Sequence, residues 1–194
     1  MVETADRLFY AEGLRAVGVE RIVAEASVTR VTFYRHFASK DELIHEYLSG
    51  RANRARDRIE AAAESEPGNS RAVLDAIAQT LVEDGAILGF RGCEFVNAAA
   101  EYPDVAHPAR AVAAGQRAWL VDLAAEALAA LGHPRPRRFA EALLMLRTGA
   151  AVAADLDHSD DAGEVFLESW HAFVDASIPD IGEGARSSRG THAS

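Results

Sequence analysis

The sequence predicts an all-α protein of about nine helices, with an N-terminal helix-turn-helix unit of three helices and a larger C-terminal helical domain. Apolar residues recur at helical spacing along most of the chain, and no stretch alternates apolar and polar residues as a half-buried strand does. Hydrophobic residues make up 49% of the chain, with much alanine and few β-branched runs, which favours helix over sheet.

Three short helices are predicted to form the N-terminal unit. The first covers about residues 2–13, where apolar residues share one face and a glycine ends the pattern. The second covers residues 19–26, whose apolar residues follow the i, i+3, i+4, i+7 pattern. A Ser-Val-Thr turn then leads into a third helix over residues 29–36, with Phe33 and Phe37 facing the core.

The fourth helix begins at a capping box. The Ser39 hydroxyl is expected to accept from the Glu42 amide, and the Glu42 carboxylate to reach back to the Ser39 amide. The helix continues to about residue 64 as a connector between the domains. Its four arginines are predicted to form a solvated face with salt bridges to nearby acids: Arg51, Arg54, Arg56 and Arg58 with Asp57 and Glu60.

A Glu-Pro-Gly-Asn-Ser break at residues 66–70 follows the connector. This break is the best candidate for a domain boundary. The helix-turn-helix DNA-binding domain itself is placed at residues 1–48, and the connector together with the helical ligand-binding and dimerisation domain at residues 49–178. Five more helices are predicted in the second domain, at about residues 71–88, 92–101, 108–132, 136–155 and 160–177. The Gly/Ser/Arg-rich tail, residues 179–194, is predicted to be disordered.

Charge is distributed unevenly along the chain. The net charge is −10, yet residues 1–58 hold ten Lys and Arg against nine Asp and Glu, so the remainder carries −11. This pattern indicates a near-neutral module with a local basic face joined to an acidic body. No segment has the apolar length of a signal peptide or a membrane span, so we expect a cytoplasmic protein that does not bind membranes.

Metal, cofactor and enzyme chemistry find no support in the sequence. The single cysteine, Cys93, excludes an intramolecular disulfide and a cysteine-rich zinc site, and the seven histidines are scattered. Neither a nucleophile elbow nor a glycine-rich phosphate loop occurs. We therefore expect no metal, no cofactor and no enzymatic activity, and Cys93 is either a redox sensor or, more commonly for this residue type, a buried small hydrophobe.

The segment from Val28 to Lys40 contains cations and aromatic residues but no carboxylate. The second helix of a helix-turn-helix enters the major groove of DNA, where a carboxylate facing phosphates would weaken binding. The Tyr34 hydroxyl is placed to donate to a phosphate. Double-stranded DNA is therefore the expected partner of this segment.

Residues Leu8 to Leu48, "LFYAEGLRAVGVERIVAEASVTRVTFYRHFASKDELIHEYL", resemble the tetracycline-repressor (TetR) family of bacterial regulators. The segment "GCEFVNAAAEYPD", Gly92 to Asp104, is similar to one seen in many members. The resemblance implies phosphate contacts by Thr29, Thr32, Tyr34 and Lys40, base contacts by Arg30 and Arg35, and a place near the DNA backbone for His36. The chain departs from the family pattern at Gly18, where Ser or Thr is usual, at Ser27, where Gly is usual, and in a short N-terminus without a basic arm.

The resemblance also implies a pocket among the central helices and a twofold dimer formed by the last two helices. Pocket candidates combine apolar bulk with one amide: Phe90, Cys93, Phe95, Asn97, Trp119, Leu123 and Met145. Each of these is at least as well explained as part of the core. Candidates for the dimer interface are the large apolar residues of the last two helices: Leu143, Leu144, Phe166, Trp170 and Phe173.

The sequence thus predicts a homodimeric regulator, most simply a repressor that binds a palindromic operator and is released by a partly apolar small molecule. The alternatives are a helical ligand-binding or scaffold protein without operator binding, and a small helical enzyme. A disrupted recognition helix would favour the first alternative and clustered catalytic groups the second, and the sequence has neither feature.

Overall fold

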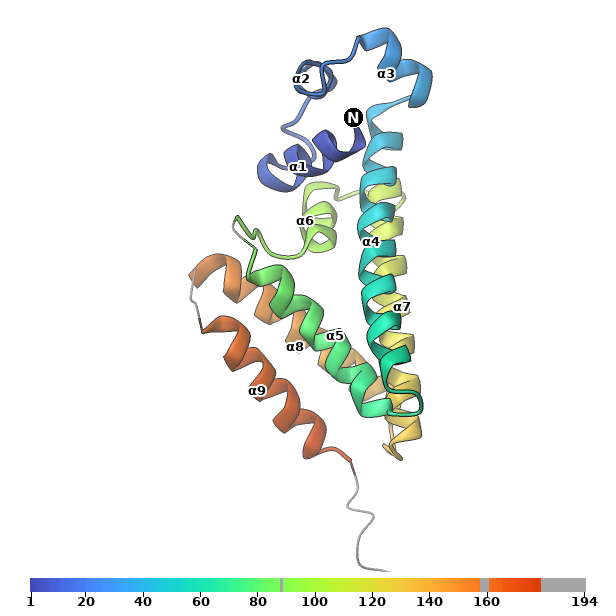
Figure 1. Cartoon of the computed structure of the whole chain (residues 1–194), viewed down its shortest axis with the longest axis vertical. Helices are drawn as coiled ribbons and strands as arrows, with labels where there is room; N and C mark the ends of the chain where they lie inside the picture. Colours follow the sequence, from blue (N-terminus) through green and yellow to red (C-terminus); the bar gives the residue numbers. More distant parts are fainter. Residues whose placement is uncertain (88, 158–160, 179–194) are drawn as a thin grey trace, which may run out of the picture.

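The structure is a computed structural model that describes residues 1–87, 89–157 and 161–178 (Figure 1). These residues form nine helices and no strand, which confirms the all-α prediction. The helices are α1 (Val2–Glu12), α2 (Val19–Glu25), α3 (Arg30–His36), α4 (Lys40–Ser65), α5 (Ser70–Gly85), α6 (Glu94–Glu101), α7 (Pro108–Ala130), α8 (Pro136–Asp157) and α9 (Ala162–Asp175). The tail predicted to be disordered, residues 179–194, lies outside the described residues.

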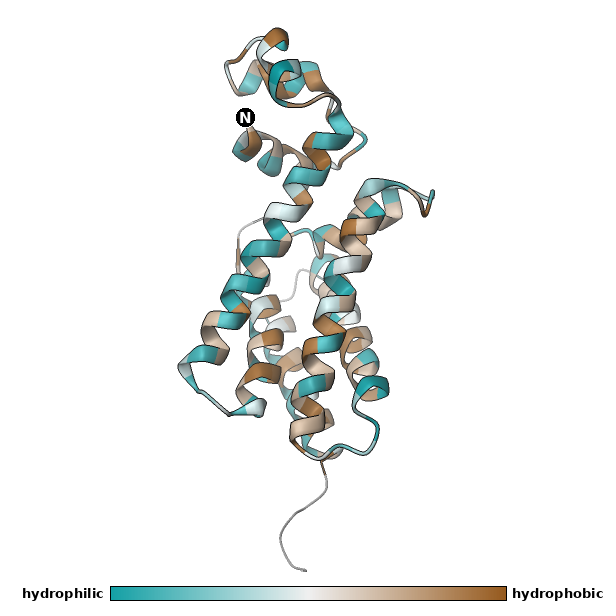
Figure 2. Cartoon of the chain, turned by 90° about the vertical axis from the view of Figure 1, so that its right-hand side faces the viewer, coloured by the Kyte–Doolittle hydropathy of each residue, from teal (hydrophilic) through white to brown (hydrophobic). Residues whose placement is uncertain are grey.

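Helices α1, α2 and α3 lie at one end of the elongated molecule, and α4 runs from them along the whole body (Figure 1). Beyond its first turns α4 carries mostly hydrophilic residues on the side seen in Figure 2. Within the described ranges, no helix combines the length and the apolar character needed to span a bilayer.

Local side-chain caps explain where several helices begin. The Ser39 hydroxyl accepts from the Glu42 amide at 3.1 Å, as predicted for α4. The Glu42 carboxylate returns to the Ala38 amide at 2.5 Å, one residue earlier than predicted. Asn69 caps α5 in the same way, and α7 begins with Pro108, which suits a first helical position because its missing N–H would be unpaired there.

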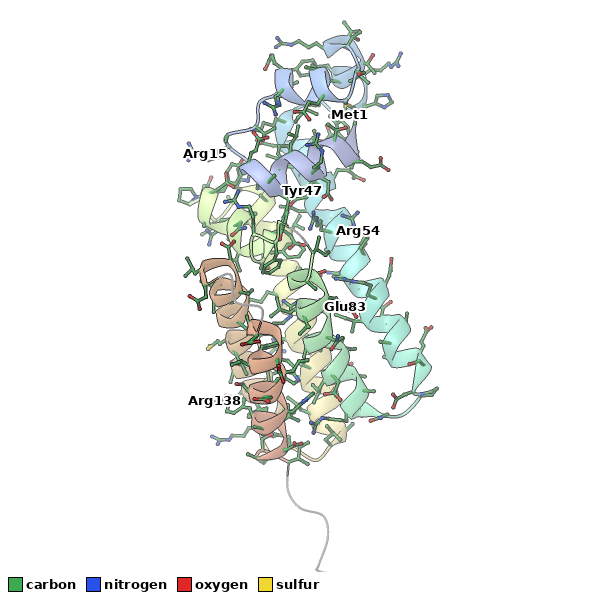
Figure 3. The ribbon with its side chains drawn as sticks, turned by 60° about the vertical axis from the view of Figure 1, so that its left-hand side comes forward. Met1, Arg15, Tyr47, Arg54, Glu83 and Arg138 are labelled. Atoms are coloured by element: carbon green, nitrogen blue, oxygen red, sulfur yellow. The ribbon has the colours of Figure 1, made fainter. Side chains whose placement is uncertain are left out.

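The arginines of α4 link this helix to its neighbours. Arg51 and Arg54 bind Asp6 of α1, at 2.6 and 2.7 Å (Figure 3 labels Arg54). Arg58 binds Asp84 of α5 at 2.9 Å, and Arg56 donates to the Gln116 amide oxygen of α7 at 3.0 Å. In the part of the chain that the structure describes, bridges to Asp57 and Glu60 are not formed, so that prediction was wrong. These arginines bond to other elements because acidic and amide groups of α1, α5 and α7 pack beside α4.

Two apolar cores hold the fold together. The larger core lies among α4, α5, α7, α8 and α9, and the smaller one joins α1–α3 to the first turns of α4. The smaller core also takes in Ala98 of α6 and Ala109 of α7, both fully buried. The N-terminal helices are therefore packed directly against the body.

Four residues predicted at a dimer interface belong to the larger core instead: Leu143, Leu144, Phe166 and Trp170. Each is at most 3% exposed, so a second copy of the chain cannot contact it. The correction has a simple cause: the largest apolar side chains of α8 and α9 gain most from burial within their own chain. Phe173, the fifth candidate, is 43% exposed and stays available.

Candidate nucleic-acid interface and internal cavity

The turn between α2 and α3 sets the position of the candidate recognition helix. Ser27 adopts a φ of 54°, and among the described residues it is the sole non-glycine with a positive φ. The Val28 amide then donates to the Val23 carbonyl at 3.0 Å, which closes the turn. Phe33 is fully buried, as predicted, and lies beside Phe37 with a ring separation of 5.9 Å. The buried ring fixes α3 on the smaller core and leaves its other side to solvent.

Replacing Ser27 with Gly should raise the free energy of unfolding by about 0.5–1 kcal/mol. Glycine adopts the left-handed backbone without strain, which stabilises the folded protein by about 1–2 kcal/mol. Glycine also gives the unfolded chain more conformational entropy, which cancels about half of that stabilisation. Because the Ser27 side chain is exposed, its removal costs little. Chemical denaturation of both proteins checks this, and a less stable variant would show that the turn is not strained.

Thr29 and Thr32 form a paired cap at the start of α3. The Thr29 hydroxyl oxygen accepts from the Thr32 amide at 3.0 Å, and the two hydroxyl oxygens lie 2.9 Å apart. One hydroxyl donates to the other, so the second keeps a free hydrogen that can be donated to a phosphate. The pair therefore combines a structural cap with one outward donor.

Arg30 carries an ion pair that the sequence pattern does not reveal. Its guanidinium lies 3.0 Å from Glu20 of α2 and 5.5 Å from the centre of the Tyr34 ring. Both members of the pair are more than 60% exposed, so the bridge contributes at most about 1 kcal/mol and DNA can displace it. One cation of the acid-free stretch is thus paired with a carboxylate from another helix.

Arg35 and His36 are exposed on α3 and form no ion pair with any described residue. Val31, on the same helix, is 80% exposed. An apolar group on a recognition helix can contact the methyl group of thymine. Val31 was missed from the sequence, and its position off the Phe33–Phe37 face is the signal that could have found it.

Lys40 is the first residue of α4, and its side chain reaches the loop after α1. Its ammonium donates to the Arg15 carbonyl at 3.4 Å, and partial burial lowers the pKa of Lys40 from its ordinary value. The remaining two ammonium hydrogens are available to an anion.

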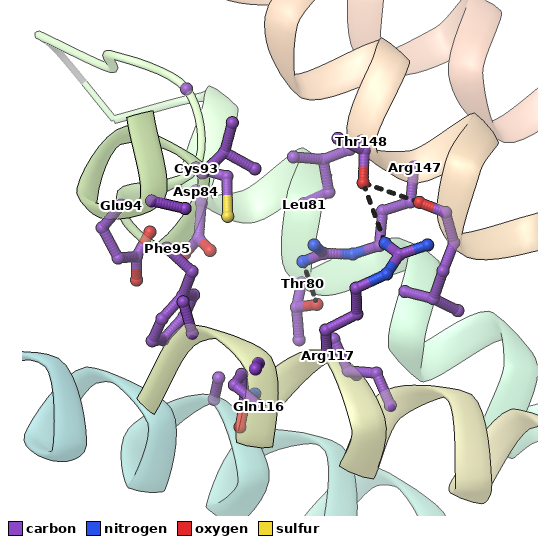
Figure 4. Close-up of a pocket in the computed structure, with 18 of the residues that line it drawn as sticks. Thr80, Leu81, Asp84, Cys93, Glu94, Phe95, Gln116, Arg117, Arg147 and Thr148 are labelled. Atoms are coloured by element: carbon purple, nitrogen blue, oxygen red, sulfur yellow. Dashed lines mark hydrogen bonds between the residues drawn. The ribbon is translucent and has the colours of Figure 1, made fainter. Parts of the chain in front are cut away.

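A cavity of about 510 Å³ lies within the body, bordered by α4, α5, α6, α7 and α8. Its apolar wall includes Ile59, Leu81, Phe90, Phe95, Leu120 and Leu144. Polar side chains of the lining, several of them labelled in Figure 4, are Thr80, Asp84, Glu94, Arg110, Gln116, Arg117, Arg147 and Thr148.

Of the seven pocket candidates, Phe90, Cys93 and Phe95 line this cavity. The other four lie outside its lining. Asn97 donates to the Arg91 carbonyl at 2.8 Å, and Met145 is 65% exposed on α8. Trp119 stacks under the Arg56 guanidinium, and Leu123 packs half-buried on the larger core. The cavity's arginines were missed because the choice of candidates favoured apolar bulk.

Cys93 and Glu94 occupy one wall of the cavity. Burial raises the pKa of the Cys93 thiol, which keeps the thiol protonated and weakly nucleophilic. Burial also raises the pKa of Glu94, partly offset by the Arg51 guanidinium 4.0 Å away. These shifts favour a binding cavity over a site of thiolate chemistry.

Helices α8 and α9 each present a row of exposed small or apolar residues. The rows are Met145, Gly149, Val152, Ala153 and Leu156 on α8, and Val165, Ser169, Ala172 and Phe173 on α9 with Ala176 directly after it. Both rows have the spacing i, i+4, i+7, i+8, i+11, which places each on a single helix face. We call the two rows together the α8–α9 face. This face contains Phe173. It is now the candidate surface for contact with a second copy, because the other four residues predicted at the dimer interface are buried.

Residues 1–47 match the family model described as bacterial regulatory proteins of the tetR family. The crystal structure of SCO4454, a TetR-family transcriptional regulator from Streptomyces coelicolor, is 40% identical with a TM-score of 0.86, over 92% of this chain and 94% of that one. The chain belongs to the TetR family.

Two further solved structures share the fold. The reduced form of NemR from E. coli is 23% identical with a TM-score of 0.77, over 88% of this chain and 93% of that one. A TetR transcriptional regulator from Legionella pneumophila is 16% identical with a TM-score of 0.77, over 92% of this chain and 95% of that one. Comparison with curated protein sequences gives no match. Membership of the TetR family supports a DNA-binding transcriptional regulator as the function class.

Proposed function

We propose that this TetR-family chain is a cytoplasmic, homodimeric repressor that binds a palindromic operator and is released by a small molecule in the cavity. The observation that carries the proposal is the position of α6. Its first turn lines the cavity with Glu94 and Phe95, and its last residue, Glu101, holds the loop between α1 and α2. One short helix thus contacts both the cavity and the candidate DNA-binding unit.

The DNA-binding part of the proposal rests on the exposed side of α3. Arg30, Arg35 and Val31 are candidates for base contacts, because they lie on the solvent side of the helix. Thr29, Thr32, Tyr34, His36 and Lys40 are candidates for phosphate contacts. A twofold dimer would present two copies of α3 to successive major grooves, which a palindromic site requires.

The release part of the proposal rests on two links, from α6 to the α1–α2 loop and from the cavity wall to α1. The Glu101 carboxylate accepts from the amides of Leu14 and Arg15, at 2.9 and 2.7 Å. Arg51 lies 4.0 Å from Glu94 and donates two hydrogen bonds to Asp6, at 3.2 and 2.6 Å. A ligand that shifts α6 would therefore shift the α1–α2 loop, and it changes operator affinity only by its differential affinity for the two states.

Binding of the purified protein to its own upstream DNA tests the regulator function. We expect a saturable gel shift at nanomolar protein that a random duplex does not compete at equal concentration. Fragments selected from genomic DNA then identify the operator and its symmetry. Equal affinity for selected and random fragments would contradict the proposal and favour the ligand-binding or scaffold alternative.

Replacing Glu101 with Gln should weaken the hold of α6 on the α1–α2 loop. The amide loses the charge that strengthens two hydrogen bonds, and the local contact should lose about 1–3 kcal/mol. We expect the Leu14 and Arg15 amides to exchange hydrogen at least about tenfold faster, together with weaker operator binding. Glu126 is exposed on α7, so Glu126→Gln is a matched control that should leave both quantities unchanged. Unchanged exchange in Glu101→Gln would remove this link from the mechanism.

A further inference from the structure

Two arginines of the cavity have no carboxylate partner. Figure 4 shows Arg117 of α7 and Arg147 of α8 extending into the cavity, across from Cys93, Glu94 and Phe95. Among the described residues, the Arg117 guanidinium hydrogen-bonds to the Thr148 hydroxyl, at 3.5 Å, and Arg147 donates to the Ile77 carbonyl and the Thr80 hydroxyl, both at 3.3 Å. Across the described ranges, neither guanidinium lies within 4.0 Å of an acidic group. These long contacts leave most of their N–H donors unused.

The carboxylates of the cavity do not balance this charge. Asp84 pairs with Arg58 at 2.9 Å, and Glu94 lies 4.0 Å from Arg51, and neither arginine lines the cavity. The third arginine of the lining, Arg110, donates to two backbone carbonyls at the end of α6. The cavity of a chain with net charge −10 therefore holds two arginines that no carboxylate among the described residues contacts directly, and Glu94 acts on Arg147 only at longer range.

The hydroxyls beside the two arginines are already committed. Thr148 donates to the Leu144 carbonyl at 2.7 Å, and Thr80 donates to the Ile77 carbonyl at 3.0 Å. Both hydroxyls can only accept from a ligand or from the arginines, so the donors left at this wall belong to the guanidinium groups. Guanidinium groups match carboxylates in shape and charge, and a carboxylate between two of them relieves their mutual repulsion.

We propose that the cavity binds a small amphipathic acid, whose carboxylate contacts Arg117 and Arg147 and whose apolar body lies against Phe90 and Phe95. The other lining residues on the apolar side, among them Leu81 and Leu120, provide the surface that such a body buries. This inference rests on the proposed function, because it names the chemical class of the molecule that the regulator senses.

Titration calorimetry of the full chain with matched probes tests the charge preference. The probes are 2-naphthoate, 2-naphthylmethanol and 2-naphthylmethylammonium, with decanoate and decan-1-ol as a flexible pair. We expect each acid to bind at least about tenfold more tightly than its alcohol, and the ammonium compound to bind least. Failure of both acids to bind, or equal binding of acid and alcohol, overturns the proposal.

Variants of the two arginines test the contact itself. Arg117→Met and Arg147→Met should each lower affinity for the acids at least about tenfold and leave binding of the alcohols unchanged. Arg147→Lys, which keeps the charge, should recover part of the loss. Arg135 is exposed outside the cavity, so Arg135→Met is the matched control. Because Arg147 also bonds to α5, circular dichroism checks its folding, and Arg117→Met keeps the test valid if Arg147→Met does not fold. Undiminished acid binding in a folded Arg117→Met variant contradicts the proposal.

Operator binding by the same preparations separates this inference from the proposed function. Acid binding that leaves operator affinity unchanged supports the ligand class and contradicts release by ligand. Operator binding without acid binding supports the regulator and contradicts the ligand class.

Discussion

Replacing Val165 with Asp should convert the protein to a monomer and abolish specific operator binding. Val165 is 59% exposed in one chain and is the first residue of the α9 row of the α8–α9 face. Twofold symmetry would bury both copies of the new carboxylate in one interface, and an uncompensated buried charge costs about 3–5 kcal/mol. A monomer carries one recognition helix and therefore contacts only half of a palindromic site.

Analytical ultracentrifugation at micromolar protein and a gel shift on the operator measure the two effects. Ala61 is exposed on α4, away from the α8–α9 face, so Ala61→Asp adds the same charge as a control and should remain a dimer. A dimeric Val165→Asp variant would show that copies of the chain associate through another surface.

Replacing Arg35 with Ala should weaken operator binding by about 1–3 kcal/mol and relax sequence preference if the side chain contacts a base. Arg35 is exposed and has no ion-pair partner among the described residues, so the variant should keep its stability. Arg30→Ala should cost less than Arg35→Ala, because Arg30 must first leave Glu20.

Fluorescence anisotropy with operator and random duplexes, at one fixed salt concentration, measures both losses. Arg135→Ala serves as the control, since that arginine is exposed on the body. An equal loss on operator and random DNA would assign Arg35 to phosphate contact, and no loss on either would remove it from the interface.

The helices could be predicted from the sequence because their ends depend on local groups. The Ser39 cap, the Pro108 start and the glycine after α1 act within one turn of the chain, so the predicted bounds lie close to those observed. The recognition helix was predictable for the same reason, since Phe33 and its neighbours form one short contiguous motif.

Contacts between elements could not be predicted in this way. Glu20 lies beside Arg30 only because the α2–α3 turn brings them together, and Arg51 reaches Asp6 across 45 positions. Arg117 and Arg147 look like ordinary solvated residues in sequence, because periodicity does not distinguish a helix face that lines a cavity from one that faces water. Size was misleading for the dimer surface: Trp170 is buried, while smaller residues of α9 remain outside.

Ala98 and Ala109 belong to the body in sequence, yet they complete the core of the N-terminal helices. A fragment that ended at residue 48 would lack these two members of the smaller core and would lack the Glu101 contact with the α1–α2 loop. The N-terminal helices therefore do not form a core that is independent of the body. Truncation or a body mutation that loosens α6 and α7 should therefore destabilise the helix-turn-helix unit too, and so lower the affinity of the protein for DNA.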